Sequence, residues 1–423
     1  MSFTEPADGV EIADRPDDWS AFYRDLHEHP ELSFQETRTA ALVAEQLAGF
    51  GFEVATGVGG TGVVGVLRNG EGPVALLRAD MDALPVEERT GLPYASKVRA
   101  ADSAGTDVPV MHACGHDVHV TCLVGACKIL ARQRETWAGT VLAVFQPAEE
   151  VGDGADAMIR DGLFERFGRP VVVLGQHVAP IPAGLVALRP GPAFAAADAL
   201  RVVLYGRGGH GSRPEGAIDP VVMAAATVMR LQTVVSRELG GDESAVVTVG
   251  AMKAGTAVNI IPDEAELLIS VRSFTPGVRT RVLAAIERIV RAEAAASGAD
   301  REPLVEVTAS FPAVVNDEAA ADRTRPALET VSPIVVDPGP VTGSEDVGQF
   351  ATAAGAPCVY WLLGGADPAA FAGAATIAEI AERVRALPSN HSPLFAPVIE
   401  PTLTTGVRAL VAAAQAWLPR LNA

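Results

Sequence analysis

Apolar and polar positions follow two periods along this chain, one typical of helices and one typical of strands. Between residues 19 and 50 the apolar positions recur every three or four residues, which predicts two helices separated near His29 and Pro30. Residues 51–70, read as GFEVATGVGGTGVVGVLRNG, predict a strand, a glycine turn and a second strand. A dinucleotide-binding loop needs a helix directly after its glycines, whereas residues 63–67 continue as strand. We therefore set that interpretation aside.

Three further apolar runs predict buried strands, and each ends in side chains that can bind a metal. PVALLRADMD ends in Asp80 and Asp82, GTVLAVFQPAEE ends in Glu149 and Glu150, and PVVVLGQHV ends in His177. Open α/β sheets build their sites at the carboxyl ends of their strands. A turn with solvated acids is the plainer interpretation of each pair alone. The recurrence on three strands favours one shared site.

The pattern changes near residue 191 and changes back after residue 311. The intervening stretch predicts strand, helix, strand, strand, helix and strand, which is the order of a small ferredoxin-like βαββαβ domain. The chain then returns to alternating helix and strand. We therefore expect an α/β fold in which a catalytic domain, residues 1–191 and 312–423, carries a mixed sheet flanked by helices and is split by an inserted domain, residues 192–311.

The stretch MHACGHDVHV, residues 111–120, concentrates the metal-binding chemistry of the chain. It contains His112, Cys114, His116, Asp117 and His119, which offer sulfur, nitrogen and oxygen ligands. A single histidine here would more simply line a polar loop, with the cysteine as a small buried hydrophobe. So many ligand-type side chains in one loop predict a metal site.

Glu149 and Glu150 suit a hydrolytic metal site because successive side chains diverge, so that one can bind a metal while the other faces the substrate. A bound metal lowers the pKa of water to about 7, and a carboxylate beside it can take the proton as the water attacks a carbonyl. The same acid can then protonate a leaving amine. The alternative is an acidic pair on the surface.

Polar residues of the inserted domain add candidates for substrate binding. His210 lies in the glycine-rich GRGGHGSRP, where it could donate a hydrogen bond to an oxyanion. Asn259 in NIIPDEAEL and Arg272 in SVRSF could hold an amide or a carboxylate. These residues could instead have no role in substrate binding, with His210 as a single histidine in a loop and Arg272 as a surface residue of a strand.

Charge and cysteine usage limit the partners. The 33 basic and 52 acidic residues give a net charge of −19, which disfavours nucleic acid and anionic membranes. The acidic start MSFTEPADGVEIADRPDDWS lacks the features of a secretory signal, and no apolar run is long enough for a membrane span. The four cysteines show no disulfide framework. We expect a cytoplasmic protein.

Eight motifs resemble, in order, those of the amidohydrolase family that contains hippurate hydrolases, bacterial N-acyl-amino-acid amidohydrolases and plant auxin-conjugate hydrolases. They are FYRDLHEHPELSFQE, LRADMDALPVEE, MHACGHDVH, FQPAEEVGDGADAMI, GRGGHGSRP, NIIPDEAEL, GSEDVGQF and NHSPLF. The resemblance extends from about Phe22 to Phe395 and implies a zinc-aminopeptidase-like catalytic domain, with the inserted domain serving as lid and in dimerisation.

The same resemblance implies the roles of individual residues. Cys114 bridges two divalent ions, Mn or Zn, and the remaining metal ligands are His116, Glu150, His177 and His391. Glu149 is the general base and acid. Asp80, Asp82, His112 and His119 support the ligands. The protein forms a homodimer or a higher homo-oligomer, and His210 acts in its own subunit or in a neighbouring one.

The predicted function is metal-dependent hydrolysis of the amide bond of N-acyl or N-aroyl amino acids. His210 would stabilise the oxyanion, and Arg272 or Asn259 would hold the substrate carboxylate. The alternatives are a dinuclear dipeptidase or aminopeptidase, a non-catalytic metal-binding protein, and a thiol hydrolase with Cys114 as nucleophile. The sequence leaves open the acyl group, the amino acid and the role of residues 344–346.

Overall fold

The computed structural model describes residues 16–332 and 334–420, and their contacts divide the chain into two compact units. The first unit takes in the described residues up to Gly191, then Val315–Gly339, and those from Asp346 onward. The second unit comprises Pro192–Val314 together with the short segment Pro340–Glu345. The second unit therefore interrupts the first twice along the chain.

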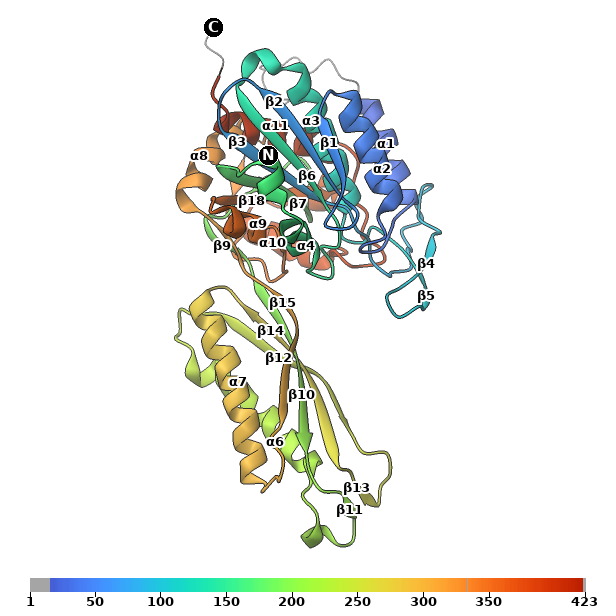
Figure 1. The fold of residues 1–423 in the computed structure, drawn as a ribbon, viewed down its shortest axis with the longest axis vertical. Helices are drawn as coiled ribbons and strands as arrows, with labels where there is room; N and C mark the ends of the chain where they lie inside the picture. Colours follow the sequence, from blue (N-terminus) through green and yellow to red (C-terminus); the bar gives the residue numbers. More distant parts are fainter. Residues whose placement is uncertain (1–15, 333, 421–423) are drawn as a thin grey trace. The chain divides into compact units, whose positions relative to one another are not determined.

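A mixed sheet forms the centre of the first unit (Figure 1). In the described part of the chain its strands are, in order across the sheet, β1 (Glu53–Val58), β2 (Gly62–Asn69), β6 (Gly139–Gln146), β3 (Val74–Asp80), β7 (Val172–Pro182), β18 (Cys358–Ala366), β8 (Val186–Ala187) and β17 (Val335–Val336). Strands β6, β3, β7 and β18 are parallel neighbours, whereas β1 and β2 form an antiparallel hairpin at the edge. The predicted mixed α/β sheet is confirmed.

Helices pack against this sheet and enclose its hydrophobic core. They are α1 (Pro16–Glu28), α2 (Thr37–Gly49), α3 (His116–Arg132), α4 (Gly154–Arg160), α5 (Leu163–Phe167), α8 (Glu318–Glu329), α9 (Gly348–Ala354), α10 (Ile377–Ala386) and α11 (Thr402–Trp417). Helices α3 and α11 contact each other and both contact β3 and β7. Apolar side chains of α1, α2, α3, α8 and α11 form one buried cluster with the central strands, so the start of α3 is held against the middle of the sheet.

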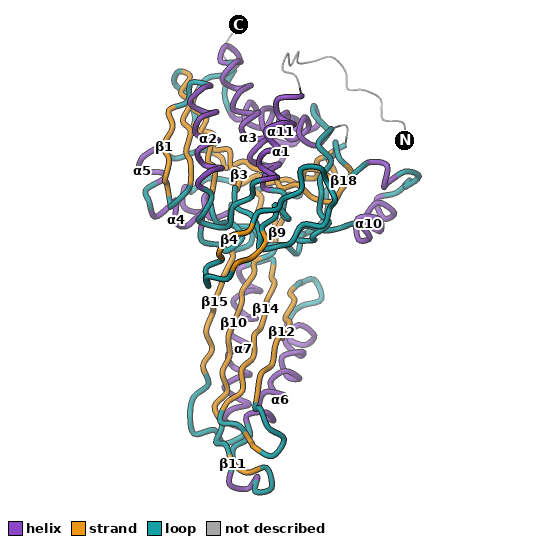
Figure 2. The backbone as a smooth tube through the Cα atoms, turned by 90° about the vertical axis from the view of Figure 1, so that its right-hand side faces the viewer, coloured by secondary structure: helices purple, strands orange, loops and turns teal. Residues whose placement is uncertain are grey.

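The second unit has a four-stranded antiparallel sheet in the order β12-β14-β10-β15. Its elements along the chain are β10 (Ala196–Tyr205), α6 (Pro220–Thr233), β12 (Ala245–Ala254), β14 (Glu264–Ser273), α7 (Pro276–Ala296) and β15 (Leu304–Phe311). The two helices pack on one face of the sheet through apolar residues at helical spacing (Figure 2). The side chains of Asp219 and Thr275 cap the starts of α6 and α7. The predicted βαββαβ order is present.

Several short elements were not predicted. They are β4 (Arg99–Ala101) paired with β5 (Asp107–Pro109), β9 (Gly191–Phe194) paired with β16 (Val314–Asn316), and β11 (Gly209–His210) paired with β13 (Ile260–Ile261). Such pairs are too short for a periodic pattern to mark them. Among the described residues, no helix combines the length and the apolar character that a bilayer crossing requires.

Candidate metal centre

Adjacent parallel strands bring three groups of polar side chains to one edge of the large sheet. Strand β6 pairs with β3, and β3 pairs with β7, so the carboxyl ends of the three strands lie together. Asp80 is the last residue of β3, and Glu149 follows β6 by three residues. His177 differs from the expectation, because β7 continues beyond it to Pro182. It projects from within the strand.

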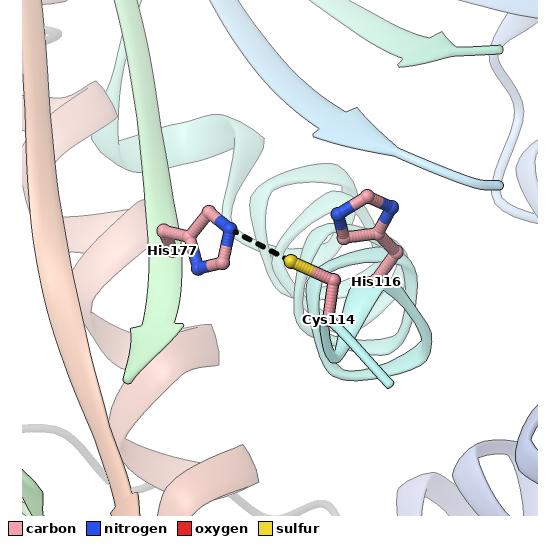
Figure 3. A group of neighbouring side chains, drawn as sticks. All are labelled: Cys114, His116 and His177. Carbon is pink, nitrogen blue, oxygen red and sulfur yellow. Dashed lines mark hydrogen bonds between the residues drawn. The ribbon is translucent and has the colours of Figure 1, made fainter. Parts of the chain in front are cut away.

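The loop before α3 turns sharply at Gly115, which places Cys114 and His116 beside β7. Gly115 has φ +89°, and a Cβ on it would lie 2.4 Å from Cγ1 of Val178. Only glycine satisfies both conditions, because other residues rarely adopt this conformation and would clash with the strand. Figure 3 shows the side chains of Cys114 and His177 pointing toward each other, with His116 at the start of the helix.

Cys114 belongs to two groups of ligand-type side chains at once. In each group the candidate ligand atoms lie within 4.8 Å of one another. One group joins Cys114 to His116 and His177, and the other joins it to Glu150 and His391. The sulfur is 3.5 Å from Nε2 of His177. The other four residues predicted as ligands thus gather around the sulfur atom of Cys114.

Asn390 and His391 reach this cluster from the end of the first unit. The backbone N–H of His391 donates to the carbonyl of Ala113 (2.8 Å), and Nδ2 of Asn390 donates to the carbonyls of Cys114 and Val178 (2.9 and 3.1 Å). His391 adopts φ +70°, which is uncommon for a residue with a Cβ. Its Nε2 lies 3.4 Å from Oε2 of Glu150. Asn390 therefore ties this loop to the cysteine loop.

The orientation of Glu149 and Glu150 corrects the prediction that their side chains diverge. Oε2 of Glu149 lies 3.9 Å from Nε2 of His116, and Oε1 of Glu150 lies 3.7 Å from the same nitrogen. The residues lie in a turn that begins at Ala148, with φ +50°, so the alternation of a strand does not apply. Asp82 accepts hydrogen bonds from the backbone N–H groups of Glu149 and Glu150 (3.1 and 3.0 Å) and thereby holds the turn.

A buried network supports the ligands from the side of the sheet. Nδ1 of His119 donates to Asp80, while Nε2 of His119 accepts the backbone N–H of Val178 (2.8 Å). Arg78 donates to Asp80 at 2.6 Å and to Asp346 at 3.0 Å. His119 forms a group of ligand-type side chains with Asp80 and His116. Both of its nitrogens are engaged in hydrogen bonds, so its supporting role remains the prediction for this histidine.

The electrostatics of the cluster favour a cation. Burial, followed by the nearby Glu150 and Glu149, raises the pKa of the Cys114 thiol well above its usual value. Burial also raises the pKa of Glu150 to about 7. Burial alone would lower the pKa of His116, but Asp80, Asp82 and Glu150 outweigh it and raise that pKa to about 10. A divalent cation would offset this excess of carboxylates.

The nitrogens of the cluster are also suited to metal ligation. Nδ1 of His177 donates to the carbonyl of Val178 (2.8 Å), which leaves Nε2 as the unprotonated nitrogen that faces Cys114. Among the described residues, the two ring nitrogens of His116 and Oε1 of Glu150 have no hydrogen-bond partner, although these atoms are buried. Buried polar atoms without partners are costly, and a bound metal would satisfy them. The donor set therefore fits divalent ions.

His112 lies apart from these groups. It is 1% exposed, and burial lowers its pKa to about 4. Neither of its nitrogens has a hydrogen-bond partner among the described residues, and it joins none of the groups of ligand-type side chains found there. Its predicted supporting role remains a prediction.

The three candidate residues of the second unit do not all lie close together. His210 pairs with Ile260 in the β11–β13 ribbon, and the carbonyl of Asn259 accepts the backbone N–H of Gly211 (2.8 Å). Arg272 lies near the other end of β14 and donates to the hydroxyl of Ser344. Arg272 lies eight positions after Glu264 along β14, which corresponds to about 27 Å of extended strand. His210 and Asn259 are thus neighbours, while Arg272 is distant from both.

Sequence reasoning missed Arg78, Gln146 and Ser33, and it left the role of Asp346 open. Arg78, Gln146 and Asp346 form a buried polar network below Asp80, and Ser33 donates to Asp82 (2.6 Å). A buried arginine inside the apolar run PVALLRAD was a signal for such a network, because a charge on a central strand requires partners.

Comparison with known proteins found sequences and structures that are similar to this chain. The model of the family described as peptidase family M20/M25/M40 matches residues 76–388. Hippurate hydrolase from Campylobacter jejuni is 41% identical over 348 residues, which cover 80% of this chain and 86% of that protein. Thermostable carboxypeptidase 1 from Saccharolobus solfataricus is 38% identical over 346 residues, covering 81% and 84%. A crystal structure described as a dinuclear metal-binding peptidase from Bacillus subtilis is 29% identical, with a TM-score of 0.74, and covers 95% of this chain and 97% of that one.

Proposed function

Because the chain belongs to peptidase family M20/M25/M40, we propose that the cluster around Cys114 is the two-metal centre of a hydrolase. The protein is a metal-dependent amidohydrolase that cleaves the amide bond of N-acyl amino acids, releasing a carboxylic acid and a free amino acid. The observation that carries this proposal is the place of Cys114 in both groups of ligand-type side chains, with Glu149 beside them.

The proposed ligands divide into two sets that share the sulfur. His116 and His177 would hold one ion with Cys114, and Glu150 and His391 would hold the other. Two divalent ions at this position supply Lewis acidity, which polarises a carbonyl and makes water easier to deprotonate. Thiolate and imidazole ligands suit zinc, whereas carboxylates also suit manganese. We assign the ions as Zn or Mn, to be distinguished by reconstitution of the metal-free protein with each.

The chain's own groups move the proton and hold the substrate. Glu149 takes a proton from the water that attacks the amide carbonyl, and it returns this proton to the nitrogen that leaves. His210 donates a hydrogen bond to the oxyanion that forms. Asn259 or Arg272 binds the carboxylate of the amino acid; the bidentate fork of arginine suits that group.

Replacing Glu149 by Gln tests this proposal directly. We expect Glu149→Gln to retain both metal ions, because Glu149 is not among the proposed ligands, and to lower kcat by about a thousandfold. Metal content by inductively coupled plasma mass spectrometry and hydrolysis of N-benzoylglycine give the two measurements. Hydrolysis at the unmodified rate would show that Glu149 is not the acid and base.

Two rival reactions have distinct signatures. A dipeptidase or aminopeptidase would recognise a free α-amine, so it would prefer free dipeptides to N-acetyl, N-benzoyl, long-chain acyl and indole-acetyl amino acids. A thiol hydrolase using Cys114 would stay active after chelation. We expect the opposite result in both assays; in the second, burial raises the pKa of the thiol and so disfavours a nucleophilic thiolate.

We further propose that two copies of this chain associate through the second unit. Strand β12 is an edge of the sheet in the described part of the chain, and α6 beside it exposes Val222 and Met229, at 61% and 71%. An unpaired edge next to apolar side chains favours association. Met229→Glu should then lower the mass measured by light scattering from that of a dimer to that of a monomer.

The association would also explain a role for His210 at the site of the partner. Co-expression of a Glu149→Gln chain with a His210→Ala chain, followed by purification of the mixed dimer, tests this role. If His210 acts across the dimer, one site of the mixed dimer has both residues intact and activity returns. A mixed dimer as inactive as its two parents would show that His210 acts within its own subunit.

A further inference from the structure

The segment of residues 31–36, the ELSFQE part of the HEHPELSFQE motif, has no role in the function proposed so far. It runs beside the end of β3, where Leu32 forms a parallel bridge with Ala83 and the backbone N–H of Ala83 donates to the carbonyl of Glu31 (2.8 Å). The side chain of Glu31 accepts the backbone N–H groups of Arg38 and Thr39 and so caps α2. The segment is therefore fixed at both of its ends, next to Asp82.

The carboxylate of Glu36 lies at the end of this segment and joins three separate loops. Glu36 is completely buried. Its Oε1 accepts the backbone N–H groups of Phe34 (3.0 Å) and Ala148 (2.9 Å), and its Oε2 accepts the hydroxyl of Thr61. The partners come from the segment itself, from the turn after β6 and from the β1–β2 turn. A buried carboxylate that accepts these three hydrogen bonds holds its partners in fixed positions.

Two of these partners have a backbone conformation that residues with a Cβ rarely adopt. Phe34 has φ +61° and Ala148 has φ +50°. A non-glycine residue in the left-handed region is strained and persists only where the surroundings hold it. The hydrogen bonds to Glu36 supply that support, and Ala148 directly precedes Glu149.

Glu36 and Asp82 accept hydrogen bonds from successive backbone N–H groups of the turn after β6. Glu36 accepts the N–H of Ala148, and Asp82 accepts the N–H groups of Glu149 and Glu150. Asp82 also lies 3.3 Å from Nδ1 of His116, so its loss would disturb a proposed metal ligand directly. Among the described residues, Glu36 makes no hydrogen bond or ion pair with a proposed ligand; its removal therefore frees the N–H groups of Phe34 and Ala148 and the hydroxyl of Thr61 without taking a bond from the proposed ligands.

We infer that Glu36 is a positioning residue for the acid and base Glu149: its carboxylate holds Ala148 in the left-handed conformation that aims Glu149 at the metal centre. This inference rests on the proposed role of Glu149. A displacement of about 1 Å of a catalytic group can lower a rate by about a hundredfold, so an anchor one residue away affects turnover strongly.

Four variants test the inference. Glu36→Ala removes the anchor. Glu36→Gln keeps an oxygen that can accept both backbone N–H groups, and its amide can donate to Thr61. Ala148→Gly relieves the cost of the left-handed conformation, because glycine adopts it freely. Thr61→Val removes the hydroxyl donor alone and serves as the matched control.

We expect Glu36→Ala to lower kcat by about 10- to 100-fold, with KM and the content of two metal ions unchanged. Glu36→Gln and Thr61→Val should stay within about threefold of the unmodified enzyme. Adding Ala148→Gly should restore much of the kcat of Glu36→Ala and raise its melting temperature by more than it raises that of the unmodified protein. The melting temperatures provide a readout that does not depend on activity.

Two results would overturn the inference. One is a Glu36→Ala enzyme with unmodified kcat. The other is a loss in Glu36→Ala that follows loss of metal and that Ala148→Gly leaves unchanged, since Glu36 would then have a general structural role. If Glu149→Gln is inactive in the same assays, either result counts against the role of Glu36 alone. An active Glu149→Gln enzyme would instead refute the proposed function.

Discussion

Two clusters of histidine and carboxylate flank the start of α3, and consecutive residues of the chain belong to each. His116 faces the cluster around Cys114, whereas Asp117 accepts a hydrogen bond from Nδ1 of His27 (2.6 Å). Nε2 of His27 lies 3.1 Å from Glu88, which completes the second cluster. Both clusters are assembled from distant segments and both are buried. Residue type and burial therefore do not distinguish them.

The clusters differ in how far their polar atoms are satisfied. Each ring nitrogen of His27 has a carboxylate partner, and although burial alone would lower its pKa, Asp117 and Glu88 raise that pKa to about 10. In the described part of the chain, the ring nitrogens of His116 complete no hydrogen bond, although the carboxylates of Asp80, Asp82 and Glu150 lie near the ring. A satisfied cluster stabilises a fold, whereas an unsatisfied cluster with excess negative charge is suited to a metal.

The largest effect should come from removing the shared sulfur. We expect Cys114→Ala to lose at least one of the two metal ions and to lower kcat/KM by about a thousandfold or more, because both ligand groups depend on Cys114. Cys127→Ala is the matched control, since Cys127 is also buried but lies in the apolar core. Metal analysis and hydrolysis of N-acyl amino acids measure both. A Cys114→Ala enzyme with full metal content would contradict the proposed difference between the two clusters, in which the cluster around Cys114 binds metal and the cluster around His27 does not.

An intermediate effect is expected from His119, which braces the metal centre without joining it. His119 connects Asp80 to the backbone of Val178, next to His177. His119→Ala should weaken metal affinity by about 10- to 100-fold, as loss of a group that orients ligands does. Saturating metal should recover most of the turnover. Isothermal titration calorimetry of the metal-free protein gives the affinity, and unchanged affinity would show that this brace is dispensable.

The smallest effect on activity should come from the satisfied cluster. Because the pKa of His27 in the folded protein is about 10, above its ordinary value of 6.5, its contribution to stability is fully present below pH 6.5 and is lost as the pH rises toward 10. The free energy of unfolding should therefore fall between pH 7 and pH 10 by about 3 kcal/mol more in the unmodified protein than in His27→Gln. Denaturant unfolding at several pH values measures it, while metal content stays unchanged. Parallel pH dependences would contradict a charged His27.

The gathering of the proposed ligands could be predicted from the sequence better than the detail of their surroundings, for a physical reason. Asp80, Glu149 and His177 each follow or lie in a buried strand whose apolar run is easily recognised, and parallel strands bring such positions together. The prediction that the side chains of Glu149 and Glu150 diverge was wrong, because their directions depend on the left-handed turn at Ala148. The N–H of Ala148 donates to Glu36, which lies 112 residues away, and no local pattern marks such a contact.

The register of strand β14 explains why two predicted substrate-binding residues lie far apart. Asn259 and Arg272 were both predicted to bind substrate because they are polar residues of the inserted domain that could hold an amide or a carboxylate. The pairing of β14 with β10 places Arg272 opposite Ala197, at the start of β10, whereas Asn259 lies beyond the far end of β14. A strand carries residues apart at about 3.4 Å each, so a short sequence separation becomes a long distance. Each of the two residues is therefore a separate candidate for binding the substrate carboxylate.

The most direct test of the two-metal centre is an anomalous difference map from crystals of the protein loaded with zinc, recorded at the zinc absorption edge. The proposal predicts two peaks, each about 2.3 Å from the sulfur of Cys114, one beside His116 and His177 and the other beside Glu150 and His391. It predicts no peak at His27. A map in which no peak lies next to Cys114 would contradict the account.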